Sequence, residues 1–247
     1  MRRRLLRPLA ALIVLLVVAV AAIELGGRQA LAGLAAGELA TALDTDADDV
    51  SVEVGGGSLV AQLLGGSLTE VSVTADDARL GDVTGALAAT ATGVPLDSSR
   101  ASEGLDATLT LAPATLESLV RQLSAFADAT VSLGEGTATV TTSASLLGVG
   151  VDVAVTFTVE AEDGAIALTP AAVSVGGASL DLDALRSSAY ATLLDTVAAA
   201  QSLCVAEQLP ASLALREVAV SADGVAVRVT GSNVVLAELQ DAERGSC

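Results

Sequence analysis

The stretch from Thr137 to Val175 constrains the fold most, because its apolar residues recur with a period of two. Along residues 151–159, valine and phenylalanine at the odd positions alternate with Asp, Ala and Thr at the even positions. This alternation is typical of a strand with one buried and one solvated face. Breaks at residues 148–150 and at Glu-Asp-Gly 162–164 predict turns, the second a hairpin. We therefore expect three or four adjacent antiparallel strands that share one broad aliphatic surface.

Other segments repeat one of two patterns. Shorter period-two runs predict strands at residues 50–54, 71–73, 107–111 and 213–229. Apolar residues at three- and four-residue spacings predict amphipathic helices at residues 28–43, 113–126 and 180–200, and a short helix at residues 58–68. Residues 85–92 are expected to form a weak helix or a loop, and residues 95–103 a polar linker.

These elements predict an α+β fold with a strongly curved antiparallel sheet packed around two or three amphipathic helices. The chain has no Trp, one Tyr and two Phe, so small aliphatic side chains supply the core, which suits a long, thin, curved layer. We assign residues 24–247 to one domain. Leu68, Val71 and Val73 echo Leu215, Val218 and Val220, which suggests two pseudo-equivalent halves.

Residues 1–23 read as a targeting segment, an N-terminal apolar helix after a cationic start. Fifteen uncharged apolar residues, Leu9–Ile23, span roughly 22 Å, which is short of a bilayer core of roughly 30 Å. That length favours a signal peptide cleaved near Ala21. The alternative is an uncleaved anchor that holds residues 5–25 in the cytoplasmic membrane. In both cases we expect the body to be exported to the cell envelope, either membrane-anchored or secreted.

The chain contains no histidine and no lysine. It therefore lacks the residues of Ser-His-Asp and Cys-His nucleophile systems, of lysine-based catalysis and of histidine-ligated zinc. Thirty acidic residues leave a carboxylate-only glycosidase open, but no motif places a catalytic pair. We expect a protein that is not an enzyme and needs no cofactor.

The net charge of −18 bears on the partners. Four of the twelve cations lie in the first seven residues and every acid lies beyond residue 23. The body therefore repels phosphate backbones, which argues against nucleic acid. It also repels anionic membrane surfaces, so any lipid contact must depend on burial of hydrocarbon.

Two short features bear on metal binding and cross-linking. The acidic run 44–49 departs from a calcium loop at Asp49 and Gly55, where that loop needs Gly and Glu, so we expect an exposed turn and no metal site. Cys204 and Cys247 are the only cysteines. In an exported protein two cysteines most simply pair, which would contribute about 3–4 kcal/mol, and two free thiols are the alternative.

The apolar start, the early helix and the sequence of residues 59–73, Leu-Val-Ala-Gln-Leu-Leu-Gly-Gly-Ser-Leu-Thr-Glu-Val-Ser-Val, carry a resemblance to a known family. Together with the pattern of residues 213–229, they resemble the actinobacterial LmeA-like family of cell-envelope phospholipid-binding proteins. The resemblance implies a tubular lipid-binding fold, with a curved antiparallel sheet around long helices. It also implies phospholipid or glycolipid as partner, with a role in lipomannan-type glycolipids for some members.

Our leading hypothesis is a non-catalytic phospholipid-binding or lipid-carrier protein that holds acyl chains in an aliphatic groove. The alternative is a passive stalked scaffold or interaction domain of the envelope, whose apolar faces bury one another in a filled core. The candidate lipid-binding residues are Leu59, Leu63, Leu64, Leu68, Phe126, Leu146, Leu147, Val155 and Phe157. The apolar turn at residues 146–150 is either the mouth of such a groove, a tip that dips into a bilayer, or part of the core.

Overall fold

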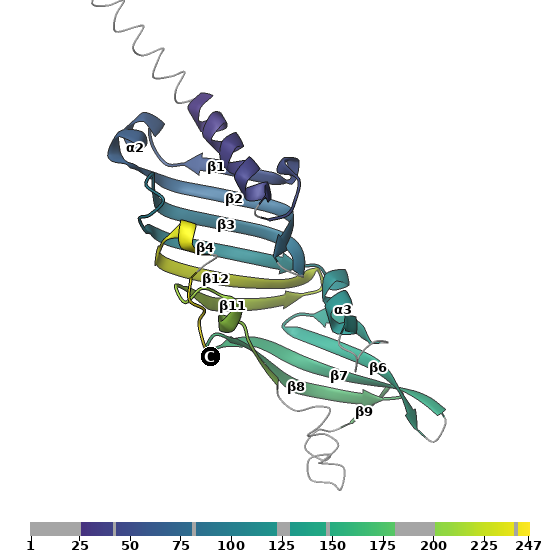
Figure 1. The fold of residues 1–247 in the computed structure, drawn as a ribbon. Coiled ribbons are helices and arrows are strands. Elements are labelled where there is room, and N and C mark those ends of the chain that lie inside the picture. The colour runs from purple at the N-terminus through teal and green to yellow at the C-terminus, as the bar shows by residue number, and fades with distance from the viewer. Residues whose placement is uncertain are drawn as a thin grey trace, which may run out of the picture.

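The computed structural model describes residues 26–41, 43–80, 83–122, 129–146, 149–180, 201–239 and 242–247. They form an elongated molecule in which two antiparallel sheets follow one another along the long axis (Figure 1). The α+β class is confirmed. The expected single, strongly curved sheet is wrong, because the strands divide between two open sheets that neither close nor curl strongly.

The first sheet has the strand order β1-β2-β3-β4-β12-β11. Its strands are β1 (Val50–Gly55), β2 (Ser67–Leu80), β3 (Val83–Pro95), β4 (Ser102–Leu111), β11 (Leu213–Ser221) and β12 (Gly224–Val234). The early strands β1–β4 follow one another as a meander, and the late hairpin β11–β12 joins them through the pairing of β12 with β4. The two ends of the chain therefore build one sheet.

The expectation for residues 85–92 is wrong, since they lie within β3. Leu87, Ala89 and Ala91 alternate with Ala88 and Thr90, and β3 is hydrogen-bonded to β2 on one side and to β4 on the other. Alanine has a weak intrinsic strand preference, but pairing with two neighbours outweighs it here.

The second sheet has the order β10-β8-β7-β6-β5. Its strands are β5 (Thr130–Gly134), β6 (Thr137–Leu146), β7 (Val149–Glu162), β8 (Ala165–Val175) and β10 (Gln201–Cys204), with the short β9 (Ala178–Leu180) paired to β8. The predicted meander over residues 137–175 is therefore confirmed as β6, β7 and β8. Asp163 and Gly164 both have positive φ angles, 47° and 83°, which is the backbone of a two-residue hairpin turn.

Helices are few in the described part of the chain. A helix covers residues 26–41, close to the predicted 28–43. The others are α2 (Leu59–Gly65), α3 (Pro113–Gln122) and the short 3-10 turns η1 (Ala47–Asp49), η3 (Ala206–Gln208) and η4 (Leu236–Glu238). Both α2 and the start of α3 were predicted; the helix expected at 180–200 lies outside the described residues except for Leu180, which belongs to β9. No helix of the described ranges is both long and apolar enough to cross a membrane.

The 26–41 helix packs on the first sheet and makes the core cluster there. Ala40 and Leu43 are buried with Val50, Val52 and Ala75 of β1 and β2, and further contacts reach Leu87 of β3. The opposite end of this helix is fixed by Arg28, whose guanidinium donates to the carbonyls of Val54, Gly56 and Gly57. These bonds occupy carbonyl groups at the end of the edge strand β1.

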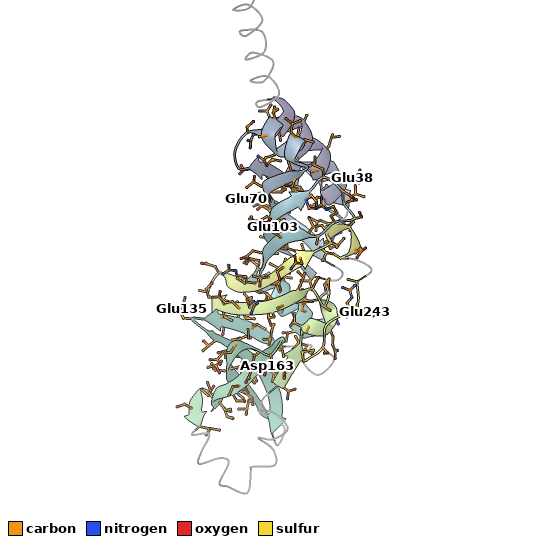
Figure 2. All side chains as sticks on the ribbon, turned by 90° about the vertical axis from the view of Figure 1, so that its left-hand side faces the viewer. Glu38, Glu70, Glu103, Glu135, Asp163 and Glu243 are labelled. Carbon is orange, nitrogen blue, oxygen red and sulfur yellow. A yellow bond between two sulfur atoms is a disulfide. The ribbon has the colours of Figure 1, made fainter. Side chains whose placement is uncertain are left out.

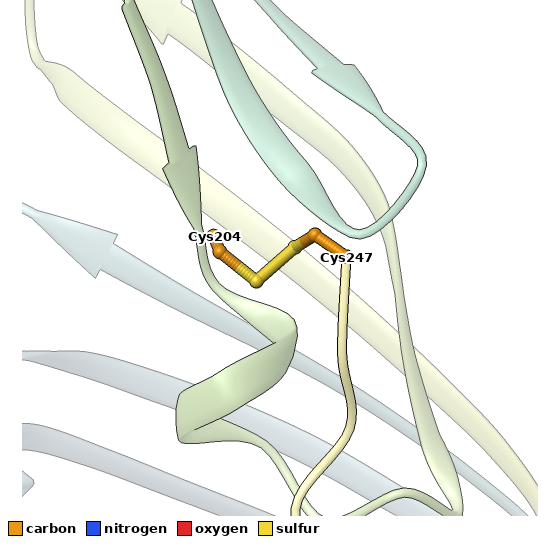
Figure 3. The surroundings of a disulfide bond; sticks show 2 residues. All are labelled: Cys204 and Cys247. Carbon is orange, nitrogen blue, oxygen red and sulfur yellow. A yellow bond between two sulfur atoms is a disulfide. The ribbon is translucent and has the colours of Figure 1, made fainter.

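The two sheets meet at β11, which contacts β5, β6 and β7. The amide of Gly136, in the β5–β6 turn, donates to the carbonyl of Val220 over 2.9 Å. The C-terminal segment returns to the second sheet, where Cys247 forms a disulfide with Cys204 at the end of β10 (Figure 3). The same segment is held by two backbone hydrogen bonds, in which the amide of Gly245 donates to the carbonyl of Leu209 and the amide of Ala211 donates to the carbonyl of Glu243.

Candidate functional site

One face of the first sheet is aliphatic from edge to edge. Residues that pair directly across antiparallel strands point to the same side of a sheet. One such row across all six strands consists of Val50, Ala75, Leu87, Leu109, Val227 and Val218. The next rows repeat this composition with Val52, Val73, Ala89, Ala107 and Val229, and then with Val54, Val71, Ala91 and Leu105.

The reverse face carries the intervening residues and is polar. Ser72 and Thr90 lie 3.3 Å apart through their hydroxyl oxygens. On β12, Arg228 donates to both carboxylate oxygens of Asp106. This charge-assisted hydrogen bond lowers the pKa of Asp106 below its ordinary value and raises that of Arg228. The first sheet thus has one polar face and one face of aliphatic side chains.

The aliphatic face is only partly covered. Over β1 and β2 the 26–41 helix buries Val50, Val52 and Ala75. Farther along the sheet, a set of large and small aliphatic side chains stays half-buried although the strands that carry them are central. This set, called the open aliphatic patch below, consists of Leu105, Ala107, Leu109 and Leu111 on β4 and Val225, Val227 and Val229 on β12.

The second sheet also has an aliphatic face, but that face is better buried. Its rows contain Val131, Val140, Val155 and Val173 directly paired across four strands. Val155, Val159 and Val173 are all buried. Threonines such as Thr139 and Thr156, whose hydroxyl oxygens lie 2.8 Å apart, line the reverse side.

Two hollows of the described surface are lined by other kinds of residue. One of about 420 Å³ is lined by Asp44, Thr45, Asp46, Asp49, Asp77, Arg79 and Thr84. The other, about 200 Å³, lies beside it, with Asp76, Asp77 and Asp223 among its lining residues. Both of these hollows are lined mainly by acidic, hydroxyl and small side chains, and neither is an aliphatic groove.

The acidic turn at the larger hollow does not organise carboxylates around a cation. Asp44 is instead paired with Arg79, with 2.6 Å between Oδ2 and Nη1. Among the described residues, no group of three or more His, Cys, Asp or Glu side chains is arranged to hold a metal ion. Other acids are distributed over the whole length of the molecule, as the labelled side chains from Glu38 to Asp163 in Figure 2 illustrate.

The structure divides the predicted lipid-binding residues between the two sheets. At the first sheet, Leu59 at the start of α2 is fully buried, Leu68 is half-buried in β2, and Leu63 and Leu64 are exposed. At the second sheet, Val155 is buried and Phe157 half-buried, both on β7. Leu146 ends β6, and its side chain is not described; Phe126 and Leu147 lie outside the described residues. Helix α2 and strand β7 lie toward opposite ends of the molecule (Figure 1), so these residues do not converge on one site.

Sequence reasoning did not select the open aliphatic patch. It did predict strands over residues 107–111 and 213–229, which carry much of the patch. The signal in the sequence was that every second residue of both strands is aliphatic, as in Val225, Val227 and Val229. What the alternation does not reveal is how much of each face a helix will cover.

Comparison with known protein families gives a match. The family model described as LmeA-like phospholipid-binding matches residues 22–230. No curated protein and no solved structure gives a significant match.

Proposed function

The chain belongs to the LmeA-like phospholipid-binding family, and on that premise we propose that the open aliphatic patch is where it holds phospholipid acyl chains. The chain would act as a non-catalytic lipid-binding or lipid-carrier protein outside the cytoplasmic membrane. In place of an enclosed channel, the lipid would lie on an open, water-repelling sheet face.

The observation that carries this proposal is the incomplete burial of the patch. Leu109 and Val227 face each other on two central strands, yet both remain half-buried. A contiguous apolar patch that its own domain leaves partly accessible to solvent is a candidate surface for a ligand, membrane or partner. Along β4, the six-residue interval from Leu105 to Leu111 extends over about 20 Å, which accommodates a long hydrocarbon chain.

The energetics favour a hydrocarbon ligand. Removing about fifteen methylene groups from water contributes on the order of 12 kcal/mol before the cost of ordering the chain. The patch offers only carbon atoms, and the body is strongly acidic, so affinity would come from acyl chains more than from head-group charge.

The extracytoplasmic location is part of the proposal. It is supported by the cationic start and apolar run of residues 1–23 and by the Cys204–Cys247 disulfide, since disulfides persist mainly in oxidising compartments. The non-catalytic role is supported by the lack of His and Lys in the sequence.

Introducing a charged side chain into the patch by mutation tests the proposed function. Leu109→Asp places a carboxylate on the aliphatic face, whereas Thr110→Asp places the same carboxylate one residue later on the exposed polar face. Full-length protein from cells is examined by native mass spectrometry with lipid extraction. We expect wild type and Thr110→Asp to retain phospholipid. Leu109→Asp should retain at least about tenfold less phospholipid per protein, because a buried unpaired carboxylate is strongly disfavoured.

A second set of variants with smaller changes distinguishes loss of binding from misfolding. Val227→Thr/Val229→Thr keeps β-branched side chains, and thus strand preference, while adding two hydroxyls to the patch. Its control is Ala226→Thr on the polar face. Reduced lipid content in the double variant alone supports the proposal. Equal lipid content in all variants, or a lipid-free wild type that takes up none from vesicles, would refute it in favour of a scaffold.

A further inference from the structure

Three exposed leucines gather at one end of the first sheet. Leu63 and Leu64 on α2 are 38% and 85% exposed, and Leu96, just after β3, is 49% exposed. The amide of Leu96 donates to the carbonyl of Gly66 over 3.0 Å, which places Leu96 next to the end of α2. These residues are called the leucine tip below.

Helix α2 is firmly anchored, so the exposure of its leucines is a fixed property of the surface. Ser58 caps its first turn by accepting from the amide of Ala61, and Leu59 is fully buried. The buried side chain of Gln62 donates to the carbonyls of Gly55 and Gly57 and accepts from the amide of Thr69. With Leu59 and Gln62 turned inward, Leu63 and Leu64 are held outward.

The position of the tip indicates what it contacts. Arg28 bonds the carbonyls of Gly56 and Gly57 immediately before α2, so the beginning of the 26–41 helix lies beside the tip (Figure 1). In the sequence, the apolar run Leu9–Ile23 ends three residues before Gly26. When this run is retained as an uncleaved anchor, the bilayer that holds it lies on the same side of the molecule as the tip.

The chemistry of the tip also fits a bilayer. Helix α2 carries no charged side chain, and the exposed side chains of Leu63 and Leu64 are not part of the buried core. The row of Val54, Val71, Ala91 and Leu105 is the end of the aliphatic face nearest to α2, so the patch begins at the same end of the sheet.

We propose that the leucine tip inserts into the hydrocarbon boundary of a phospholipid bilayer and places the Leu105 end of the open aliphatic patch next to it. This inference rests on the proposed function for its choice of partner, a phospholipid membrane. Asp97 follows Leu96 directly, and Glu70 lies beside Gly55, so the tip has acidic neighbours. Insertion is therefore driven by burial of leucine and not by attraction to anionic lipids.

The sequence provides a clean optical test, because it contains no tryptophan. Leu64→Trp makes a single reporter at the tip. Leu203→Trp is the matched control, since Leu203 is 61% exposed on β10 of the second sheet. Both full-length variants are reconstituted into phosphatidylcholine vesicles whose acyl chains carry bromine, a short-range quencher of indole fluorescence.

We expect Leu64→Trp to be quenched at least about twofold more than Leu203→Trp, with a blue-shifted emission. The quenching should not decrease as salt is raised, because screening weakens only electrostatic attraction. Equal quenching at both positions would overturn the proposal. So would a blue shift that occurs without vesicles and grows with protein concentration, because it would show that the tip contacts a second copy of the chain.

Two further variants separate this inference from the lipid-binding function. Leu109→Asp in the Leu64→Trp background should lose retained lipid but keep the quenching; loss of the quenching would mean that the probe senses lipid on the patch, and would overturn the inference. Leu63→Ser/Leu64→Ser in the otherwise unchanged chain should keep retained lipid and exchange it with vesicles about tenfold more slowly. An unchanged exchange rate would contradict the role of the tip.

Discussion

Arg228 on β12 holds Asp106 on β4 through two parallel hydrogen bonds, with 3.0 Å from Nε to Oδ1 and 2.5 Å from Nη2 to Oδ2. These residues are 122 positions apart in the chain and connect the early meander with the late hairpin. The pair lies on the polar face, directly behind the open aliphatic patch. It thus links the two strands that carry the patch without placing a charge on it.

This pair predicts a pH dependence of stability. The hydrogen bond from Arg228 lowers the pKa of Asp106 in the folded state, so the pair stabilises the fold above the pKa of the unfolded carboxyl and the effect is lost as the pH falls through the folded value. Asp106→Asn should lower the urea midpoint slightly at about pH 7, and the difference from wild type should shrink below about pH 4. Urea unfolding at a series of pH values measures this. A difference that is unchanged at about pH 3 would contradict the assignment.

Gln62 should determine the stability of α2. Its removal leaves the carbonyls of Gly55 and Gly57 and the amide of Thr69 without this partner in a partly buried place. Gln62→Ala is expected to cost about 1–3 kcal/mol and to accelerate hydrogen exchange in residues 59–66 before the strands are affected. Leu64→Ala, on the exposed side of the same helix, should change stability by less than about 0.5 kcal/mol. Equal costs for the two variants would show that Gln62 does not anchor the helix.

Gly224 begins β12 at a position where a side chain does not fit. Its φ angle is 151°, and a Cβ atom there would lie 2.3 Å from the carbonyl oxygen of Leu111. Gly224→Ala should therefore destabilise the protein by about 1–3 kcal/mol, as measured by thermal or urea unfolding. At Gly150, a Cβ atom would meet nothing within 4 Å. Gly150→Ala should accordingly be neutral or stabilising by up to about 1 kcal/mol; a larger loss there than at Gly224 would refute the steric argument.

The disulfide should matter for the C-terminal segment. Cys204 and Cys247 are separated by 43 positions, so the bond restricts a long loop in the unfolded chain. Cys204→Ser/Cys247→Ser is expected to lower the free energy of unfolding by about 2–4 kcal/mol. Reductant should destabilise wild type to a similar extent and leave the double variant unchanged. If reductant destabilises both proteins equally, the lower free energy of unfolding of the double variant does not come from the missing disulfide.

Local patterns predicted local structure well. The period-two run of residues 151–159 became β7, and Asp163-Gly164 became the hairpin turn, because both signals act over a few residues. The strand β3 was missed, since its alternating positions are filled largely by alanine, which also suits a helix.

Long-range arrangement was beyond sequence reasoning. Every strand offers a similar aliphatic face, so nothing in the composition specifies that β12 pairs with β4 or that the strands divide between two sheets. The same uniformity gave no basis for predicting which of the apolar residues point outward. Leu63 and Leu64 were assigned to a groove because they are apolar, but in α2 the polar Gln62 turns inward and these leucines turn outward.

The 26–41 helix covers β1 and β2 and reaches β3, but it leaves the aliphatic face of β4 and β12 only half-buried. In the proposed function, bound acyl chains would cover these strands much as a further helix would, and the protein would be most soluble when it is loaded. A copy without lipid would expose more apolar surface. Delivery of one lipid would then be coupled to the immediate capture of another.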